Sequence, residues 1–391
     1  MNNNAINSLN VLRGLCKDKV FLALTEYYCS TGDYTYFAFN DLLYEIYAAG
    51  AENDLFGYLS ELILGDDNAF SRSCTSPVGP SDHLSKAMIS DLTVIANLVG
   101  RLGFSEKFNL GYWNNLLIGS QASIIKNLTS YYKQKGYGMF IKNKAFTFEN
   151  GELVPLGNTD EVTLDKLKNY ADEKKIILDN VSDFMRGLPY SHMLLYGDKG
   201  TGKSSTVHAV VNKLFDEKLR LVEVSKKDVR LIPVIKRRLA DIPLKFILFL
   251  DDLSLDEQSD DIPTLKTILE GSFSNTFGNV LLIATSNRRH IVKENHSDRD
   301  NSVHPSDQID EQLSLSDRFG LTVMFSTTDK QAYLSIVDQL ADDRQLKTDR
   351  ETIRSLSERW AIAKGGRSPR RAKQFIDWAY SCEQAGRPIE F

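Results

Sequence analysis

The sequence predicts an α/β protein whose core is a parallel sheet with a phosphate-binding loop, placed between two helical regions. A short apolar run is followed by G-x-x-x-x-G-K-S at residues 197–204 and then by an amphipathic helical pattern. Beyond this loop, apolar strand patterns alternate with helical ones, as they do in sheets built from β-α-β units. Apolar residues recur at helical spacing over residues 1–135 and again from residue 328 onward.

The composition is that of an ordinary globular chain. The 391 residues are 42% hydrophobic and 25% charged, which is enough for two or three domains. A net charge of −5 argues against a protein that coats nucleic acid, although it leaves room for a local basic patch. No apolar run reaches the ~18 residues of a membrane span, the first residues lack a signal-peptide pattern, and the four cysteines are scattered. We therefore expect a cytoplasmic protein with reduced thiols and no structural zinc site.

The N-terminal region carries no pattern of chemical function. Helices are expected over 40–50, with Asn40 as the N-cap, over 55–65 and over 84–100, and a polar loop over 66–82. Six aromatic residues in this region could form a partner surface, but packing in the core is the favoured interpretation. They are Tyr27, Tyr28, Tyr34, Tyr36, Phe37 and Phe39.

The hydrophobic period changes at residues 136–158. Apolar residues on each side of a Glu-Asn-Gly turn at 149–151 predict a small hairpin, which we interpret as the linker between domains. A helix over 163–186, ended by Gly187, leads to the phosphate loop. The elements expected after the loop are strands at 219–224, 246–250, 279–287 and 321–325 and helices at 228–239, 262–270, 329–340, 351–363 and from Ser368.

The loop itself is suited to bind phosphate. Its glycines let the backbone turn tightly with N–H groups pointing inward, and the helix that follows adds the positive end of its dipole. Lys203 would reach the outer phosphates of a nucleotide, and the Ser204 hydroxyl would ligate Mg²⁺. The residues expected to contact the nucleotide are Gly197, Asp198, Lys199, Gly200, Thr201, Gly202, Lys203, Ser204 and Ser205.

A pair of acidic residues follows a strand that reads as fully buried. The apolar run 246–250 ends at Asp251-Asp252, and a parallel strand would deliver these carboxylates to the edge where the loop lies. Asp251 would hold Mg²⁺, directly or through water, and Asp252 would orient or deprotonate an attacking water. A solvated turn after a core strand is the alternative. Asn287, at the next strand end, could hydrogen-bond the same water or the γ-phosphate, although asparagine is common in plain turns.

Arg318 precedes the expected strand 321–325. An arginine in this position could project across a subunit boundary onto a neighbour's γ-phosphate, where such a group accelerates turnover by roughly 10³–10⁵. The alternative is a surface pair with Asp317, worth less than ~1 kcal/mol.

The last helix begins with basic residues. Ser368 as N-cap and Pro369 at the first helical position mark its start, so Arg370 falls in the first turn, where the helix dipole disfavours a cation. Such a cost fits a residue placed to meet an anion such as ATP. A phosphate-backbone patch formed by the basic residues of 367–373 is the competing functional interpretation, and a solvated face is the third.

Together these motifs resemble those of the AAA+ ATPases over residues from about 160 to 391. The chain looks most like a bacterial family of cytosolic AAA+ proteins known only as a domain of unknown function, and the helicase-loader and replication-initiator ATPases look like more distant relatives. The resemblance implies an α-helical N-terminal domain over 1–135, a hairpin linker over 136–158, an AAA+ core over 159–327 and a helical lid over 328–391.

The resemblance also implies roles for single residues. It gives Walker A roles to Lys203 and Ser204, Walker B roles to Asp251 and Asp252, a first-sensor role to Asn287, an arginine-finger role to Arg318 and a second-sensor role to Arg370 or, alternatively, Arg367. Many AAA+ motors carry glutamate where Asp252 stands. The shorter side chain would lie farther from the attacking water and would favour slow turnover.

The sequence therefore predicts an ATPase that binds and hydrolyses Mg-ATP at a subunit interface and remodels an unknown partner. Neighbouring copies in a homo-oligomer would complete each site with Arg318, and the N-terminal domain would recruit a protein. The alternative is a nucleotide-gated binding module or loader that acts on protein or nucleic acid with little ATPase activity. The net charge lends a nucleic-acid partner no support, and a P-loop kinase would need an acceptor pocket that no motif indicates.

Overall fold

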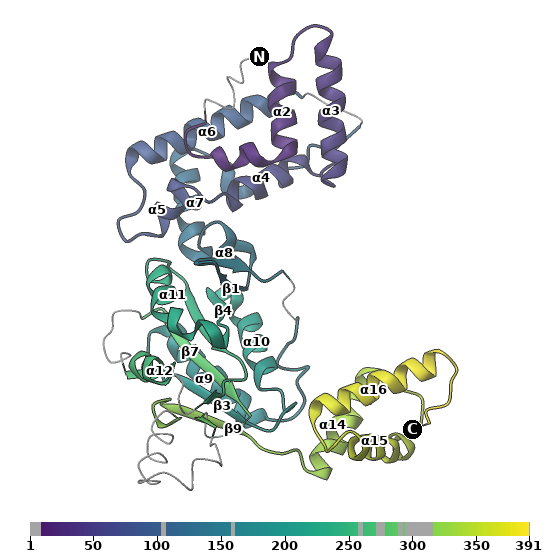
Figure 1. Ribbon diagram of the computed structural model, residues 1–391. Helices are drawn as coiled ribbons and strands as arrows, with labels where there is room; N and C mark the ends of the chain where they lie inside the picture. The colour runs from purple at the N-terminus through teal and green to yellow at the C-terminus, as the bar shows by residue number, and fades with distance from the viewer. Residues whose placement is uncertain are drawn as a thin grey trace. The chain divides into compact units, whose positions relative to one another are not determined.

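The computed structural model describes residues 9–102, 107–157, 161–256, 261–270, 278–287, 292–293 and 316–390. The chain divides into two compact units, Met1–Asn143 with Asp241–Leu244 and Lys144–Ala240 with Lys245–Phe391 (Figure 1). Of residues 288–310, the structure describes only the short strand β8 (Val292–Lys293), which pairs with β6 (Leu255–Asp256). No helix among the described residues is both long and apolar enough to cross a membrane.

The first unit is built from helices packed around one apolar core (Figure 1). Its elements are η1 (Arg13–Lys17), α2 (Lys19–Cys29), α3 (Tyr34–Ala48), α4 (Leu55–Gly65), α5 (Ala69–Thr75), α6 (Asp82–Gly100), η2 (Asn115–Leu117), α7 (Gln121–Lys135) and α8 (Met139–Lys142). Asp91 is fully buried on α6, where its carboxylate accepts the backbone N–H groups of Asn10, Val11 and Leu12 at 2.7–3.0 Å. The buried charge is thereby satisfied, and the segment before η1 is held against α6.

Two predictions for this unit are wrong. Asn40 does not cap a helix, because α3 begins at Tyr34 and its buried stripe extends back from Leu42 to Ala38. The expected loop over 66–82 contains α5. Its start is fixed by a reciprocal capping box, in which the Asn68 side chain accepts the Ser71 backbone N–H and the Ser71 hydroxyl accepts the Asn68 backbone N–H.

The favoured interpretation of the six aromatic residues is also wrong for most of them. Only Tyr27 and Phe39 are partly buried against the core, with ring centroids 5.4 Å apart. The other four are exposed: Tyr28, Tyr34, Tyr36 and Phe37.

The second unit contains a seven-stranded sheet in the order β2-β1-β4-β5-β7-β3-β9. The strands are β1 (Ala145–Glu149), β2 (Glu152–Pro155), β3 (Met193–Gly197), β4 (Leu219–Glu223), β5 (Lys245–Leu250), β7 (Val280–Ser286) and β9 (Leu321–Phe325). All neighbours are parallel except β1 and β2. The predicted hairpin therefore forms, but β1 pairs in parallel with β4, so the hairpin extends the main sheet.

Helices cover the sheet on both faces. The helices of this part are α9 (Ala171–Arg186), α10 (Lys203–Leu214), η3 (Phe215–Glu217), η4 (Lys226–Leu231), α11 (Ile232–Leu239) and α12 (Asp261–Glu270). Apolar residues of α9 and α10 cluster with Leu195, Phe249 and Ile283, which share one face of the sheet. The alternate strand residues Leu194 and Leu282 are buried too, so the opposite face is also covered.

The helix before the loop is shorter than predicted. It was expected from residue 163, but α9 begins at Ala171 because Asn169 and Tyr170 both adopt left-handed backbone conformations, with φ of 71° and 57°. Such angles interrupt a right-handed helix. Tyr170 instead connects this segment to the residue after β9, because its hydroxyl donates to the Ser326 carbonyl oxygen at 2.6 Å.

The C-terminal helices form a small bundle with an apolar core of its own. It comprises α14 (Lys330–Asp343), α15 (Arg350–Ala363) and α16 (Pro369–Gln384), the segment that we call the lid. The predicted start of the last helix is confirmed, because the Ser368 side chain accepts the Arg371 backbone N–H and Pro369 occupies the first turn.

A buried histidine makes stability depend on pH. His192 precedes β3, and its Nδ1 accepts the backbone N–H of Leu282 at 3.2 Å. Burial, with a smaller contribution from Lys236, lowers the pKa of His192 from 6.5 to about 4. The unfolded chain therefore takes up a proton near pH 6.5, and the folded protein does so only near pH 4.

The free energy of unfolding should consequently fall by about 3 kcal/mol from this group as the pH drops through that window. In His192→Asn, whose amide oxygen can replace Nδ1 as the acceptor, urea unfolding between pH 6.5 and 4 should show a shallower decline. An identical decline in the variant would contradict this assignment.

Candidate functional site

The candidate site lies where three parallel strands end at the same edge of the sheet. β3 leads into the phosphate loop, and its neighbour β7 ends at Ser286, directly before Asn287. β5, on the other side of β7, ends at Leu250 and is followed by Asp251 and Asp252. Because parallel strands share a direction, the loop and the acidic pair come together although 47 residues separate Ser204 from Asp251.

The loop backbone requires its glycines. Gly197, Gly200 and Gly202 have φ values of 132°, 84° and 101°, in the region that side chains disfavour. A Cβ at Gly197 would also lie 2.0 Å from the carbonyl oxygen of Phe325, at the end of β9. Gly202 is the N-cap of α10 and offers no side-chain cap, so the first N–H groups of this helix remain available to an anion.

Lys203 is folded back into the loop. Its ammonium group donates to the carbonyl oxygens of Gly197 at 2.7 Å and Asp198 at 2.8 Å, and its side chain is buried. Burial lowers the pKa of Lys203 from its ordinary value, while the carboxylates of Asp198, Asp251 and Asp252 act in the opposite direction. A buried cation beside open N–H donors is an arrangement that favours a polyanionic ligand.

Ser204, Asp251 and Thr285 form one hydrogen-bonded cluster. The hydroxyl groups of Ser204 and Thr285 each donate to the same oxygen of Asp251 at 2.6 Å. The Thr285 hydroxyl also accepts the backbone N–H of Asp252 at 2.8 Å. Three elements, α10, β5 and β7, are thus joined at the mouth of the loop.

Both carboxylate oxygens of Asp252 have partners. Asn287 donates to Oδ1 at 2.7 Å, and Lys226, at the start of η4, lies 3.5 Å from Oδ2. The backbone at Asp252 is left-handed, with φ of 50°, a conformation that aspartate adopts more readily than most side chains. The short acidic residue at this position therefore suits the backbone.

The lid reaches the loop through the first turn of α16. The backbone N–H of Arg370 donates to the carbonyl oxygen of Gly200 at 3.3 Å, and Ser368 also lies beside Gly200. The positive charge of Arg370 contributes to lowering the pKa of Lys203. Arg367, the alternative candidate, instead pairs with Glu358 of α15 at 3.0 Å.

Arg318 precedes the N-terminal end of β9, whereas the candidate site lies at the C-terminal ends of the strands. The first residue of β9, Leu321, pairs with Met193, and its last residue, Phe325, pairs with Gly197. Four strand residues span roughly 13 Å, so the start of β9, three residues after Arg318, lies about that far along the strand from the loop.

Sequence reasoning missed three residues that complete the site. The apolar pattern places Thr285 within a strand and gives it no role, although its place two residues before Asn287 puts it at the same strand end. Lys226 had no motif, but it follows the C-terminal end of β4, which lies at the functional edge. Thr327 donates to the Asp198 carboxylate at 2.5 Å, and nothing in the sequence indicates this contact between the segment after β9 and the loop.

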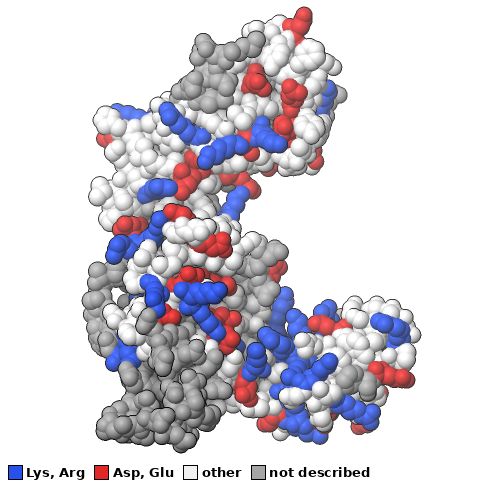
Figure 2. Space-filling model, viewed as in Figure 1, with Lys and Arg blue, Asp and Glu red and all other residues white. Residues whose placement is uncertain are grey.

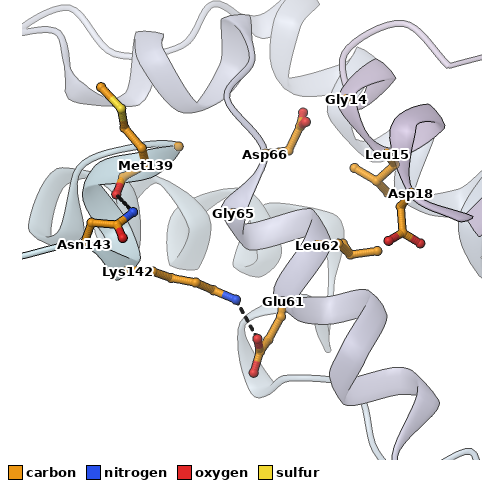
Figure 3. A pocket seen from close by; sticks show the side chains of 11 residues that line it. Gly14, Leu15, Asp18, Glu61, Leu62, Gly65, Asp66, Met139, Lys142 and Asn143 are labelled. Atoms are coloured by element: carbon orange, nitrogen blue, oxygen red, sulfur yellow. Dashed lines mark hydrogen bonds and ion pairs between the residues drawn. The ribbon is translucent and has the colours of Figure 1, made fainter. Parts of the chain in front are cut away.

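A separate hollow in the first unit has none of these features. It has a volume of about 350 Å³ and is lined by glycines, apolar residues and acidic groups together with Lys142 and Asn143 (Figure 3). Glu61 is engaged with Lys142 at 2.6 Å, and Asp18 accepts hydrogen bonds from the Tyr58 hydroxyl and the Phe21 backbone. We therefore locate the candidate site at the sheet edge alone.

The residues at that edge fit a magnesium nucleotide. Mg²⁺ prefers oxygen ligands, and a hydroxyl and a carboxylate lie together at Ser204 and Asp251. The uncapped start of α10, the left-handed glycines and the Lys203 ammonium supply what a phosphate chain requires.

Comparison with curated proteins shows short local similarities. Replication factor C subunit 5 of Arabidopsis thaliana is 37% identical over 67 residues, which are 17% of this chain and 18% of that protein. Replication factor C large subunit of Nanoarchaeum equitans is 40% identical over 68 residues, which are 17% of this chain and 15% of that protein. The chain thus spans less than a fifth of the length of either relative.

Among solved structures, similarity is found to the RuvB Holliday junction branch migration motor of Thermotoga maritima, with 16% identity, a TM-score of 0.40 and coverage of 57% of this chain and 66% of that one. The Orc1 protein of Aeropyrum pernix in complex with DNA is 15% identical, with a TM-score of 0.42 and coverage of 57% of this chain and 62% of that one. The FIGL-1 AAA domain in complex with ADP is 16% identical, with a TM-score of 0.40 and coverage of 57% of this chain and 75% of that one. At TM-scores this low the likenesses carry no argument, and the α/β architecture stands on the strand pairing described above.

A family model gives the clearest assignment. Residues 141–383 match the family described as "Protein of unknown function (DUF815)". This match covers the whole sheet, the phosphate loop, the acidic pair and nearly all of the lid. Because it spans more than half of the chain, the protein belongs to the DUF815 family.

Proposed function

We propose that this protein is an AAA+ ATPase that binds Mg-ATP at the edge formed by β3, β5 and β7. The observation that carries the proposal is the cluster in which Ser204 and Thr285 both donate to Asp251 beside the phosphate loop. A P-loop motif can occur by chance, but a chance motif would have no reason to meet an acidic strand end at hydrogen-bonding distance. The nearby first turn of α16 adds a second polar element from the lid.

The residues would divide the work of ATP hydrolysis among them. Mg²⁺ would be held by Ser204 and Asp251 and would neutralise charge on the phosphates. Lys203 would contact the outer phosphates with the donor that its two loop carbonyls leave over. Asp252 would accept a proton from the attacking water, and Asn287, already bonded to Asp252, would help to place that water.

The site would be completed by a second subunit. Arg318 comes before the end of β9 that lies away from the loop of its own chain, which supports an action as an arginine finger on a neighbouring copy. We infer a homo-oligomer in which each Arg318 faces the next nucleotide. Opening and closing of the lid with the nucleotide state would then act on a partner held by the first unit.

One observation favours a slower, switch-like protein. Both oxygens of Asp252 are occupied, by Asn287 and Lys226, and a carboxylate held in this way is a poorer base until the contacts are released. A nucleotide-gated binding module with little ATPase activity is therefore the second candidate function.

The Asp252→Asn variant separates binding from hydrolysis. It keeps the shape and the acceptor for Asn287 but loses the base, so it should bind Mg-ATP with unchanged affinity and release phosphate about 10²–10⁴-fold more slowly. Calorimetry and a steady-state phosphate assay measure the two effects. Asp228→Asn, which removes a carboxylate from η4 outside the cluster, is the matched control, and hydrolysis at the normal rate in Asp252→Asn would remove this residue from the mechanism.

A further inference from the structure

Helix α3 exposes large aromatic side chains to solvent. Tyr34, Tyr36, Phe37 and Tyr44 are 45%, 69%, 62% and 70% exposed. At 100° per residue these four positions cover about 160° of the helix circumference, opposite the buried stripe of Ala38, Leu42 and Ile46. Aromatic side chains contribute more to binding than most residues because they bury a large area at little entropic cost. We call these four residues the α3 aromatic face.

Helix α3 and the chain next to it are acidic. Residues 26–52 contain five carboxylates and no Lys or Arg, which gives this stretch a net charge of −5. The carboxylates are Glu26, Asp33, Asp41, Glu45 and Glu52. Figure 2 shows acidic groups, together with a few basic ones, among uncharged side chains over the region of α2 and α3. Helix α3 itself carries Asp41 and Glu45 and no Lys or Arg.

Aromatic rings next to this face already bind cations within the first unit. The Arg101 guanidinium lies 5.4 Å from the ring centroid of Tyr27 and 5.9 Å from that of Tyr28. The Lys107 ammonium lies 5.7 Å from the ring centroid of Phe39, which belongs to α3. The local environment therefore stabilises positive charge against aromatic faces.

We propose that the α3 aromatic face is the docking site for an arginine- and lysine-rich segment of a protein partner. The acidic field attracts such a segment and speeds its association. The exposed rings stack with guanidinium groups and with the methylene stems of basic side chains. The same charge repels phosphate groups, so nucleic acid does not suit this surface. The proposal depends on the first unit alone and holds whether or not the nucleotide site hydrolyses ATP.

The test uses the full-length protein and a fluorescein-labelled peptide of twelve residues in which arginine alternates with leucine. Fluorescence anisotropy compares wild type with the triple variant Tyr36→Ser/Phe37→Ser/Tyr44→Ser. All three side chains are exposed, so thermal unfolding should change little. Tyr36→Phe/Tyr44→Phe keeps the rings, and Tyr112→Ser removes a tyrosine that is 88% exposed outside α3.

We expect the triple variant to bind the peptide at least tenfold more weakly, with wild-type affinity in both control variants. A peptide with lysine in place of arginine should bind less tightly, and a glutamate peptide should not bind. Equal weakening in Tyr112→Ser, or unchanged affinity in the triple variant, would overturn the proposal. A dimer seen by light scattering that the triple variant abolishes would also overturn it, because a second copy would then be the occupant.

Discussion

The Arg318→Ala variant should bind Mg-ATP normally and lose turnover by roughly 10³–10⁵. Arg318 comes before the end of β9 that lies away from the loop, so under the proposed function its charge would stabilise the reaction in a neighbouring subunit. Steady-state phosphate release gives the rate, and Arg359→Ala, which removes an exposed arginine from the lid, controls for a general loss of charge.

Mixing subunits decides whether Arg318 acts across an interface. Arg318→Ala subunits keep an intact loop, and Lys203→Ala subunits keep an intact arginine. Mixed oligomers should therefore recover part of the turnover that neither variant has alone. Mixtures that stay inactive, or an Arg318→Ala protein with normal turnover, would argue against the shared site.

The Lys203→Ala variant should lose nucleotide turnover by about 10²–10³-fold or more. The change removes the buried ammonium that lies between the loop carbonyls and the acidic pair, and no other described side chain donates to the carbonyls of both Gly197 and Asp198. Titration calorimetry measures the accompanying loss of Mg-ATP affinity.

Lys213→Ala is the matched control for this variant. It removes the same charge from the last turn of α10, away from the loop, where the side chain is exposed. A solvated lysine contributes little, so this variant should keep its affinity and turnover within a few fold. Equal losses in the two variants would mean that net charge, rather than the buried position of Lys203, governs binding.

The parallel core could be predicted from the sequence because the apolar pattern of each strand agrees with its buried position in the sheet. The apolar runs of β5 and β7 are long enough to be read as buried strands, and each ends in polar residues. The strand order then places Asp251 beside Ser204. The motifs predict this contact, and the structure gives its length, 2.6 Å between the two oxygen atoms. The structure adds that Thr285 completes this cluster, which strand periodicity alone does not reveal.

The predictions of helix boundaries fail where a few residues set a backbone conformation or a cap that the apolar spacing does not reveal. Two left-handed residues, Asn169 and Tyr170, shorten a helix whose apolar spacing continues through them. A capping box at Asn68 starts a helix inside a stretch rich in loop-forming residues. The aromatic residues of α3 were assigned to the core because aromatic residues are usually buried, and periodicity could not tell which face of the helix had a partner.

The magnesium dependence of ATP binding tests the central claim most directly. We expect calorimetry to show that Mg²⁺ strengthens ATP binding to the wild-type protein. Ser204→Ala and Asp251→Asn should each remove most of this gain, and the double variant should lose no more than either single one, because both residues hold the same ion. Additive losses in the double variant, or no heat when Mg-ATP is added to wild type, would contradict the account.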